Sequence, residues 1–514
     1  MILEIHSHTS DHSACSSVSA TTLVERCYAR DLQGLVLTDH HYLWRRSEID
    51  RLRAACAVPD HFVMLAGQEV STSDSGDVLV YGADRSLNRG ISLLEIRRRF
   101  PAAALVLAHP YRNGNRPSDD TLLHPALDAV EIFNSNQRAC ENVRALQDWH
   151  RLKFTAVAGT DVHAAATCGI YPTDFEHAVG SETELAGEIR AGRVRPSLSE
   201  FLRSGTSDLQ VTELSFGGCG RRPPAERIIV KTHTDRQSLH EGSRSHRIMA
   251  AIAEHGFRTG PFRVPEPLDR DDDRLLLIEQ GIAGEPLFHA LLRDNSAHRR
   301  RRLKQAAGWL ARLHHQRLRV TPENDFLEKE PDRLGRYLSI LYKVGHRHAD
   351  RIAEIRDRVV DIERRWYHGQ PDLLIQGHGD YHPKNLFICR DDSDHPEGTY
   401  VVAIDFDSSY RLPPAFDVGT FLAQYENQLF AHADVLRDAP PHLFLDAYLE
   451  ETGERRESFL PQVALFKART ALSIIYYLVK VGMGDSEDLW RVVVSAERSL
   501  TRMASRGWEK PVAR

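Results

Sequence analysis

The chain has 514 residues, of which 41% are hydrophobic and 27% are charged, and its formal net charge is −6 at pH 7. This length exceeds what a single hydrophobic core usually supports, so we expect two or more domains, and the acidic balance excludes a general electrostatic attraction to nucleic acid or acidic lipid. No apolar run reaches the length of a membrane span, and the N-terminal segment MILEIHSH lacks the basic and apolar regions of a signal peptide, so we expect a cytoplasmic protein.

The first 200 residues alternate short β-rich runs with helical stretches. Apolar runs predict buried strands at 34–40, 77–83, 103–110, 128–134 and 154–163, and amphipathic patterns predict helices at 19–34 and 137–152. This alternation is typical of parallel strands covered by helices, in an open or a barrel-like sheet. Because the chemistry of such folds sits at the carboxyl ends of strands, the polar residues that end these runs are candidate site residues.

A change of pattern follows this region. The segment 191–210 carries Pro, Gly and Ser without a clear strand pattern, so we place a domain boundary near residue 205. Beyond it we predict a strand, a glycine turn and a second strand within 211–233, then a helix at 239–255, a strand at 275–280 and mainly helices from about 287. The basic run HRRRRLK (298–304) is interpreted as a solvated helix face rather than a nucleic-acid patch, because no aromatic residues interleave with it.

Cysteine and histidine usage point to different chemistry. The seven cysteines are scattered and include no CxxC, which argues against a disulfide framework and against a cysteine-type zinc site. The 27 histidines are more informative, because several of them follow predicted strands together with carboxylates. In chain order this set is His6, His8, His12, Asp39, His40, Glu69, His109, Glu131, Asp161 and His163.

The spacing within this set predicts a metal cluster. In an extended segment over 3–8, His6 and His8 point to the same face and can bind one ion together, and Asp161 with His163 repeats that spacing. Imidazole combined with carboxylate suits Zn, Mn or Fe. So many ligands imply two or three divalent ions, whereas the competing interpretation, unrelated solvated or core histidines, requires a coincidence at five strand ends.

The ordered series HSHT…TDH…GQE…AHP…VEIFN…GTDVH, with GRVRP near residue 192, resembles the PHP (polymerase and histidinol phosphatase) family of phosphoesterases over about residues 1–200. The resemblance implies a distorted (β/α)7 barrel that holds two or three metals and hydrolyses phosphate esters. It implies that Glu69 bridges ions, that His12 is the loop ligand with Asp11 as the alternative, and that the remaining ligands are His6, His8, His40, His109, Glu131, Asp161 and His163.

One arginine is a candidate catalytic residue beside these ligands. Divalent ions in such a cluster lower the pKa of a bound water and supply hydroxide near neutral pH. Arg112, three residues after His109, is placed to clamp the phosphate through two hydrogen bonds. A surface arginine without a role is the alternative interpretation.

A second set of residues follows in the C-terminal half. IQGHGDYHPKNLFI (375–388) places Asp380 and Asn385 five residues apart, and VVAIDFD (401–407) places Asp405 after an apolar strand. This order is typical of phosphoryl transfer, in which the first aspartate orients the acceptor hydroxyl and the asparagine and later aspartate hold magnesium against ATP phosphates.

This second set resembles the aminoglycoside phosphotransferase and choline kinase superfamily over about residues 208–505, which implies a protein-kinase-like, two-lobed α+β fold. The resemblance makes Asp380 the catalytic base or positioner and Asn385 and Asp405 the magnesium ligands, with His378 supporting the loop and Asp417 structural. It makes Lys231 the partner of the ATP phosphates, with Gly217, Gly218 and Gly220 covering them. The usual position of the lysine's glutamate partner falls near His246, and Glu241 is the nearest candidate.

We therefore expect a PHP phosphoesterase domain at 1–205 and a kinase-like domain at 206–514, acting on a small phosphate ester and on a hydroxylated acceptor with Mg and ATP. A phosphatase and a kinase that act on the same ester would form a futile cycle. We therefore expect the two activities to use different substrates or different positions on one substrate, or to be controlled by a switch between the halves. The alternatives are a phosphoesterase with a non-catalytic nucleotide- or ligand-binding domain, and, ranked below it, a nuclease or nucleotide hydrolase. The acceptor stays open because its specificity lies in variable helices and loops.

Overall fold

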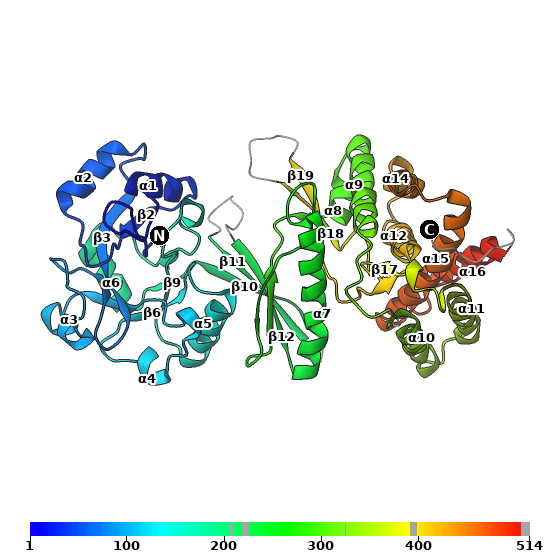
Figure 1. The fold of residues 1–514 in the computed structure, drawn as a ribbon, viewed down its shortest axis with the longest axis horizontal. Helices are drawn as coiled ribbons and strands as arrows, with labels where there is room; N and C mark the ends of the chain where they lie inside the picture. Colours follow the sequence, from blue (N-terminus) through cyan, green and yellow to red (C-terminus); the bar gives the residue numbers. More distant parts are fainter. Residues whose placement is uncertain (206–208, 218–225, 324, 391–397, 505–514) are drawn as a thin grey trace. The chain divides into compact units, whose positions relative to one another are not determined.

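The structure is a computed structural model that describes residues 1–205, 209–217, 226–323, 325–390 and 398–504. The chain divides into two compact units (Figure 1). The first unit comprises Met1–Leu239 and Leu268–Gly281, and the second comprises His240–Pro267 and Ile282–Arg514. The predicted domains, 1–205 and 206–514, are defined by the extent of the two family resemblances and not by compactness. The two compact units do not test them, so they stay a prediction.

In the first unit, nine strands of the described chain form one mixed, nearly closed sheet in the order β7-β6-β5-β4-β3-β2-β1-β8-β9. The sheet is compatible with the expected barrel. Its strands are β1 (Ile2–Glu4), β2 (Gly34–Leu37), β3 (Val63–Ser71), β4 (Asp77–Tyr81), β5 (Ala104–Leu107), β6 (Ala129–Phe133), β7 (Ala156–Ala158), β8 (Thr173–Phe175) and β9 (Val194–Pro196).

In the described chain, six α-helices accompany this sheet, and two of them, α1 (Ala20–Ala29) and α5 (Ala139–Leu152), lie within the helices predicted at 19–34 and 137–152, although α1 ends earlier than predicted. Helix α1 begins where the Ser19 hydroxyl accepts a hydrogen bond from the Thr22 amide, and it buries Leu23, Val24 and Cys27 on one face. The other helices of this region are α2 (Arg46–Ala55), α3 (Leu93–Arg99), α4 (Asp119–Leu122) and α6 (Glu182–Arg190).

Two strands, β4 and β8, depart from the expected parallel arrangement, and β8 runs antiparallel to both β1 and β9. β4 runs antiparallel to both of its neighbours, β3 and β5. The connection from β3 to β4 is a tight turn in which the Thr72 amide donates to the Gly76 carbonyl at 2.8 Å, and so short a connection cannot make the crossover that a parallel pair needs. The amino end of β4 therefore lies at the same sheet edge as the carboxyl end of β3.

The first unit contains a second, five-stranded sheet in the order β10-β11-β12-β15-β14. Its strands are β10 (Leu198–Gly205), β11 (Leu209–Phe216), β12 (Glu226–His233), β14 (Pro267–Asp271) and β15 (Leu276–Gln280). The expectation that 191–210 lacks strands is wrong, because β9 and β10 occupy most of it. β10 is an edge strand with exposed Phe201 and Leu202, so its sequence lacks the buried apolar run by which the other strands were found.

The second unit is mainly helical, as predicted. Its helices include α8 (Leu287–Arg293), α9 (Ser296–His315), α10 (Asp325–Lys343), α11 (Ala349–Tyr367), α12 (Pro414–Gln428), α13 (Ala433–Asp438), α14 (His442–Thr452), α15 (Arg456–Lys480) and α16 (Glu487–Ala504), and α7 (Arg236–Ile252) enters it from the first unit. Its short strands are β13 (Phe262–Arg263), β16 (Glu285–Pro286), β17 (Ile375–Gln376), β18 (Leu386–Arg390), β19 (Thr399–Ala403) and β20 (Arg411–Leu412).

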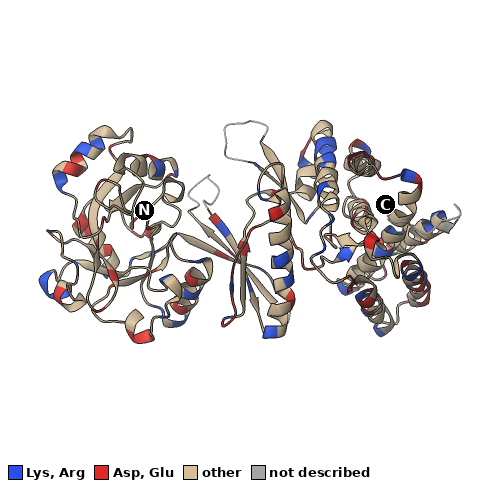
Figure 2. Ribbon diagram, viewed as in Figure 1, with Lys and Arg blue, Asp and Glu red and all other residues tan. Residues whose placement is uncertain are grey.

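The basic run 298–304 lies at the start of α9, whose lysines and arginines are visible in Figure 2. It is only partly a solvated face. Arg299 is buried and its guanidinium lies 3.0 Å from Asp438, and Arg302 is buried with Asp294 at 3.4 Å. Two of the five lysine and arginine side chains of the run are therefore neutralised inside the fold.

Across the part of the chain that the structure describes, no helix combines the length and the apolar character that crossing a membrane requires.

Candidate metal centre and phosphotransfer loop

The first candidate ligands lie directly after β1 rather than within it. β1 ends at Glu4, and Ser7 pairs with Val162 in an isolated parallel bridge. This bridge aligns the two segments that carry His6, His8 and Asp161, and all three side chains are buried. The alternation predicted for an extended segment therefore holds, although the regular strand is shorter than expected.

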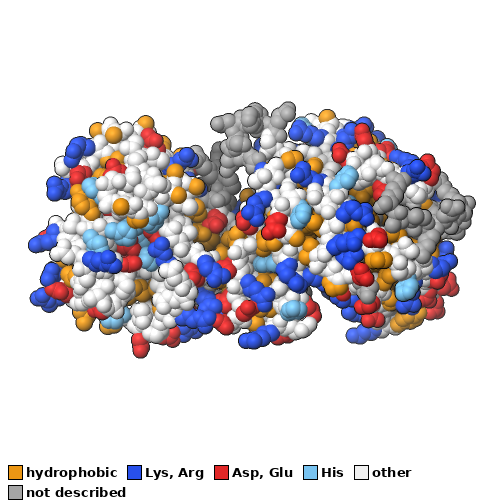
Figure 3. All heavy atoms as spheres, in the orientation of Figure 1, with side chains coloured by type: hydrophobic (Ala, Val, Ile, Leu, Met, Phe, Trp, Pro, Cys, Tyr) orange, Lys and Arg blue, Asp and Glu red, His pale blue; other side chains and the backbone are white. Residues whose placement is uncertain are grey.

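The structure brings most of the predicted metal ligands together. The candidate ligands form three overlapping groups, and within each group the ligand atoms lie within 4.8 Å of one another. His8 and Glu69 each belong to two of the groups. The groups are His6, His8, Glu69 and Asp161; His8, His40 and His163; and Glu69, Asp77 and His109. Figure 3 shows histidine side chains gathered with acidic ones on the visible face of this unit. Sharing of this kind fits a cluster of ions better than a single ion.

The buried carboxylates test whether this donor set fits a metal. Glu69 Oε2 lies 3.0 Å from His8 Nε2 and from His40 Nδ1, and Asp161 Oδ1 lies 3.1 Å from His8 Nε2. Neither carboxylate oxygen has a hydrogen-bond partner of acceptable geometry in the described structure. Buried, charged oxygens without partners are costly, and a divalent cation among them removes that cost, so the donor set fits.

The electrostatics of the cluster are dominated by mutual attraction. Burial alone would lower the pKa of His6, but the charges of Glu131, Asp161 and Glu69 raise this pKa well above its ordinary value. Burial would also lower the pKa of His8, but its contacts with Asp161 and Glu69 raise this pKa to about 9. Burial alone would raise the pKa of Glu69 and of Asp161, but the surrounding imidazoles hold both well below the usual range. The carboxylates are therefore ionised and the cluster attracts positive charge.

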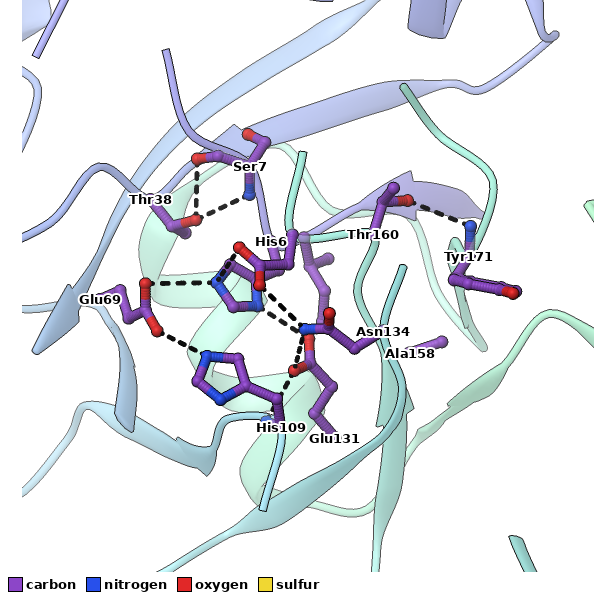
Figure 4. Close-up of polar contacts among 12 residues, drawn as sticks. His6, Ser7, Thr38, Glu69, His109, Glu131, Asn134, Ala158, Thr160 and Tyr171 are labelled. Carbon is purple, nitrogen blue, oxygen red and sulfur yellow. Dashed lines mark hydrogen bonds and ion pairs between the residues drawn. The ribbon is translucent and has the colours of Figure 1, made fainter. Parts of the chain in front are cut away.

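Glu131 lies beside the cluster and orients its members (Figure 4). Its Oε1 accepts a hydrogen bond from His6 Nδ1 at 2.8 Å, and its Oε2 accepts from the backbone amide of His109 (2.8 Å) and from the side-chain amide of Asn134 (2.9 Å). The first contact fixes the His6 tautomer with Nε2 toward the cluster. Glu131 belongs to none of the three groups, so the structure gives it this orienting role, and its role as a direct ligand stays a prediction.

Backbone geometry at the cluster is unusual. His109 and Asp161 have φ of 32° and 54°, in the left-handed region that residues other than glycine rarely adopt. A Cβ on Gly159 would lie 2.3 Å from Glu131 Oε1 and 2.5 Å from His6 Cβ, so only glycine fits there. Strained backbone of this kind is concentrated at functional sites.

The two candidate loop ligands lie outside the three groups. The His12 ring stacks on Tyr42, with ring centroids 3.7 Å apart, and its Nε2 lies 4.0 Å from Glu48. Asp11 accepts a hydrogen bond at 2.9 Å from the amide of Ala20, the first residue of α1. Neither prediction is supported by this arrangement.

Arg112 lies at the edge of the cluster. Its Nη1 is 3.5 Å from Asp161 Oδ2, and its side chain is about one third exposed at 36%. Arg112 and His109 also line a cavity of about 570 Å³ with Asp77, Asn115 and Arg116. An arginine between a metal-ligand group and an open cavity has the position that a phosphate clamp requires.

Asp77 is the residue that the sequence reasoning missed. It starts β4, and it joins Glu69 and His109 in the third group. The search for ligands considered the carboxyl ends of strands, whereas the antiparallel β4 brings its amino end to the same edge. The short turn signal STSDSG before the strand could have indicated a hairpin and hence this reversal.

The second unit brings Asp380, Asn385 and Asp405 to one hairpin. Asn385 precedes β18 and Asp405 follows β19, and these strands pair antiparallel with Leu386 opposite Ala403. The Asn385 side-chain amide donates to the Asp380 carbonyl at 3.1 Å, and Asp405 has a left-handed φ of 67°. Burial would raise the pKa of Asp380, but the nearby His382 holds it below the usual range, so this carboxylate is ionised.

The loop that carries Asp380 is held by buried Asp417. The Asp417 carboxylate accepts hydrogen bonds from the amides of His378 (2.8 Å) and Gly379 (2.7 Å), and His314 Nε2 lies 3.1 Å from it. His378 Nε2 in turn contacts the Ile404 carbonyl at 3.0 Å. The supporting roles predicted for His378 and Asp417 correspond to these contacts.

The remaining predicted nucleotide-binding residues are only partly described. Lys231 in β12 has its Nζ 3.2 Å from Glu279 Oε1 in β15. Gly217 has a left-handed φ of 66° after β11, whereas Gly218 and Gly220 lie outside the described residues. Glu241 belongs to the other compact unit, so its pairing with Lys231 stays a prediction.

Comparison with known families identifies the C-terminal part. Residues 216–460 match the model of the phosphotransferase enzyme family, APH. The C-terminal part of the chain therefore carries a phosphotransferase-family domain. A comparison with curated proteins gave no match.

Several solved structures are distantly similar. They include an ethanolamine kinase from Plasmodium vivax (14% identity, TM-score 0.40, 60% of this chain and 85% of that chain). They also include an amicoumacin kinase in complex with AMP-PNP, Ca2+ and Ami (15% identity, TM-score 0.40, 59% of this chain and 88% of that chain). A two-domain protein from Bacteroides vulgatus containing a predicted PHP-like metal-dependent phosphoesterase matches at 12% identity and a TM-score of 0.32, over 42% of this chain and 75% of that chain. Similarity at this level supports no conclusion about activity.

Proposed function

We propose that the chain is a bifunctional enzyme in which a multinuclear-metal phosphoesterase is joined to an ATP-dependent phosphotransferase that acts on a hydroxyl of a small molecule. The observation that carries the first activity is the convergence of histidine nitrogens on two buried carboxylate oxygens that lack hydrogen-bond partners, Glu69 Oε2 and Asp161 Oδ1. The phosphotransferase-family match over 216–460 supports the second.

The phosphoesterase proposal assigns roles to the residues of the first unit. His6, His8, His40, Glu69, Asp77, His109, Asp161 and His163 would hold two or three ions of Zn, Mn or Fe. Such ions supply a hydroxide near neutral pH and polarise the phosphoryl group. Arg112 would hold a phosphoryl oxygen from the open side, and Glu131 would keep Nε2 of His6 directed inward.

The phosphotransferase proposal assigns roles in both units. Asp380, which its lowered pKa keeps ionised, would orient the acceptor hydroxyl by accepting a hydrogen bond from it. Asn385, just before β18, and Asp405, just after β19, would hold magnesium, and Lys231 would contact ATP phosphates. The acceptor is a hydroxylated small molecule of a class that this site does not specify.

The test of the phosphoesterase measures hydrolysis of p-nitrophenyl phosphate and bis(p-nitrophenyl) phosphate by protein loaded with Mn²⁺ or Zn²⁺. We expect His8→Ala to abolish turnover, because His8 is shared by two of the ligand groups. His61→Ala, which alters an exposed histidine of the same unit, is the matched control and should retain activity. Turnover that survives His8→Ala would remove the metal-site assignment.

The test of the phosphotransferase measures ATP consumption across a panel of hydroxylated acceptors. Asp380→Ala should eliminate acceptor-dependent transfer, whereas Asp372→Ala, which alters an exposed aspartate just before the same loop, should not. Binding of magnesium-ATP without transfer to any acceptor would instead favour a nucleotide-sensing domain. Equal transfer by wild type and Asp380→Ala would remove the catalytic assignment.

A further inference from the structure

The turn between β14 and β15, residues 271–275, is fastened to helix α5 within the first unit. Arg144 of α5 makes a two-pronged ion pair with buried Asp271, in which Nη2 lies 2.6 Å from Oδ1. Arg274 of the turn donates from Nη2 to both carboxylate oxygens of Asp148, at 3.1 and 3.2 Å, and from Nη1 to Gln147 at 2.9 Å. Paired arginine–carboxylate contacts of this kind fix orientation as well as distance.

Helix α5 also supports the loop 109–116, which carries His109 and Arg112 of the candidate metal centre. The Tyr111 hydroxyl donates to Asp148 Oδ2 at 2.9 Å, and the Gly114 amide donates to Glu141 Oε1 at 2.6 Å. The loop is therefore held by contacts with α5 in addition to its attachment to the nine-stranded sheet.

Asp148 joins these two sets of contacts. Its side chain is only 7% exposed, and its carboxylate binds Arg274 from the turn and Tyr111 from the loop, with Arg151 as a further partner at 3.1 Å. Removing a donor from a buried carboxylate is costly, so loss of Arg274 would disturb the remaining contacts of Asp148, including the one with Tyr111. Tyr111 is the chain neighbour of Arg112, and this links the turn to the arginine that lies beside Asp161.

Apolar packing ties the turn's sheet to the barrel. Phe216 of β11 packs against Phe133 of β6, with ring centroids 4.5 Å apart, and against Tyr171 at 4.9 Å. Leu276 and Ile278 of β15 belong to the same buried cluster as residues of α5, and Figure 1 shows α5 beside this sheet. The turn is thus part of a continuous core and does not move freely relative to α5.

We propose that Arg274, which lies in the sequence region matched to the phosphotransferase family, is a positioning residue for the phosphoesterase site. Through Asp148 and Tyr111 it holds loop 109–116 so that Arg112 faces the metal-ligand group. This inference rests on the proposed phosphoesterase function. It also connects the candidate metal centre physically to a residue of the sequence region matched to the phosphotransferase family.

The test replaces Arg274 with Met, which keeps the aliphatic stem and removes the charge and the donors. We expect kcat/KM for p-nitrophenyl phosphate to fall about tenfold or more, with KM contributing to the loss, because small displacements of a positioning group are costly. Metal content per chain should stay unchanged. Arg274→Lys should restore part of the activity, and Arg270→Met, in which the lost arginine pairs with neighbouring Asp272, is the matched control.

A second measurement follows the loop directly and does not depend on turnover. Hydrogen–deuterium exchange of the 109–116 amides should rise in Arg274→Met and in Tyr111→Phe, and stay at the wild-type rate in Arg270→Met. Unchanged exchange in Arg274→Met would overturn the positioning role, as would a loss of activity explained wholly by loss of metal or by global unfolding. If wild type hydrolyses neither test ester, the proposed function fails, whereas the exchange experiment still decides the connection between turn and loop.

Discussion

The Nε2 atoms of His6 and His8 lie 3.2 Å apart inside the first unit. The Nδ1 of His6 donates to the Glu131 carboxylate, which can only accept, so in the neutral imidazole that binds a metal the Nε2 of His6 presents a lone pair to its neighbour. Two imidazole nitrogens at this separation need a proton or a cation between them. Because Glu69 Oε2 and Asp161 Oδ1 converge on the same place without hydrogen-bond partners, a cation satisfies all four atoms at once.

The first prediction concerns metal removal and stability. Chelation should lower the melting temperature of the first unit, and Mn²⁺ or Zn²⁺ should restore it, because an ion that binds only the folded state stabilises it by about 2.7 kcal/mol at a hundred times its Kd. Calorimetry of chelated protein during metal titration measures this. His8→Ala should show no metal-dependent shift, and a full shift in that variant would contradict the site.

The second prediction separates shared from unshared ligands. Glu69 belongs to two of the ligand groups and Asp77 to one. Glu69→Gln should therefore lower the number of tightly bound ions more than Asp77→Asn does, since the amide keeps the shape but loses the charge. Elemental analysis after dialysis gives the number of ions per chain. Equal losses in the two variants would show that Glu69 does not bridge.

The third prediction concerns the loop ligand implied by the PHP resemblance. His12 stacks on Tyr42 outside the ligand groups, so His12→Gln should leave the metal content unchanged. His40→Gln, which alters a histidine 3.0 Å from Glu69 Oε2, should lower it. A parallel loss of metal in His12→Gln would instead favour the ligand role that the sequence resemblance implies.

Much of the nine-stranded sheet and of the histidine–carboxylate cluster could be predicted from the sequence, because buried strands have a continuous apolar pattern and the candidate ligands follow their ends. Asp77 could not be found in that way, since it begins an antiparallel strand. β10 was missed because an edge strand exposes residues such as Phe201 and lacks the buried pattern. The local hydrophobic pattern of a sequence indicates which residues are buried, but it does not indicate the direction of a strand or whether the strand lies at the edge of a sheet.

Contacts between distant segments could not be predicted from the sequence either. Arg274 and Asp148 are 126 residues apart, and neither lies in a motif. Charged residues in a turn and on a helix are usually solvated, so their spacing carries no signal. The link between the β14–β15 turn and the metal-centre loop becomes visible only when the two segments are placed together in the fold.

The last prediction concerns pH and a buried carboxyl group in the second unit. Glu363 of α11 is buried, and its Oε1 has no hydrogen-bond partner in the described structure. Burial raises the pKa of Glu363 well above its ordinary value and the charge of Glu330 raises it further, although Arg469, which is ion-paired with Glu330, opposes this rise. Glu363 is therefore protonated in the folded state at pH values where it is ionised in the unfolded chain.

The sign of the effect on stability follows from this difference. Below the unfolded pKa of about 4.5 both states carry the proton, and stability from this group is fully present. As pH rises toward the folded pKa, the unfolded chain releases the proton first, so stability falls by about 1.4 kcal/mol per pH unit. Glu363→Gln has no proton to lose and should become progressively more stable than wild type from pH 5.5 to 8.5.

Calorimetric melting of both proteins across this pH range measures the effect on the transition of the second unit. Glu354→Gln, which alters an exposed glutamate of the same helix, is the matched control and should follow the wild-type pH profile. The decisive quantity is the gap between the melting temperatures of Glu363→Gln and wild type. A gap that stays constant with pH would mean that Glu363 is ionised in the folded protein and is compensated by Arg469.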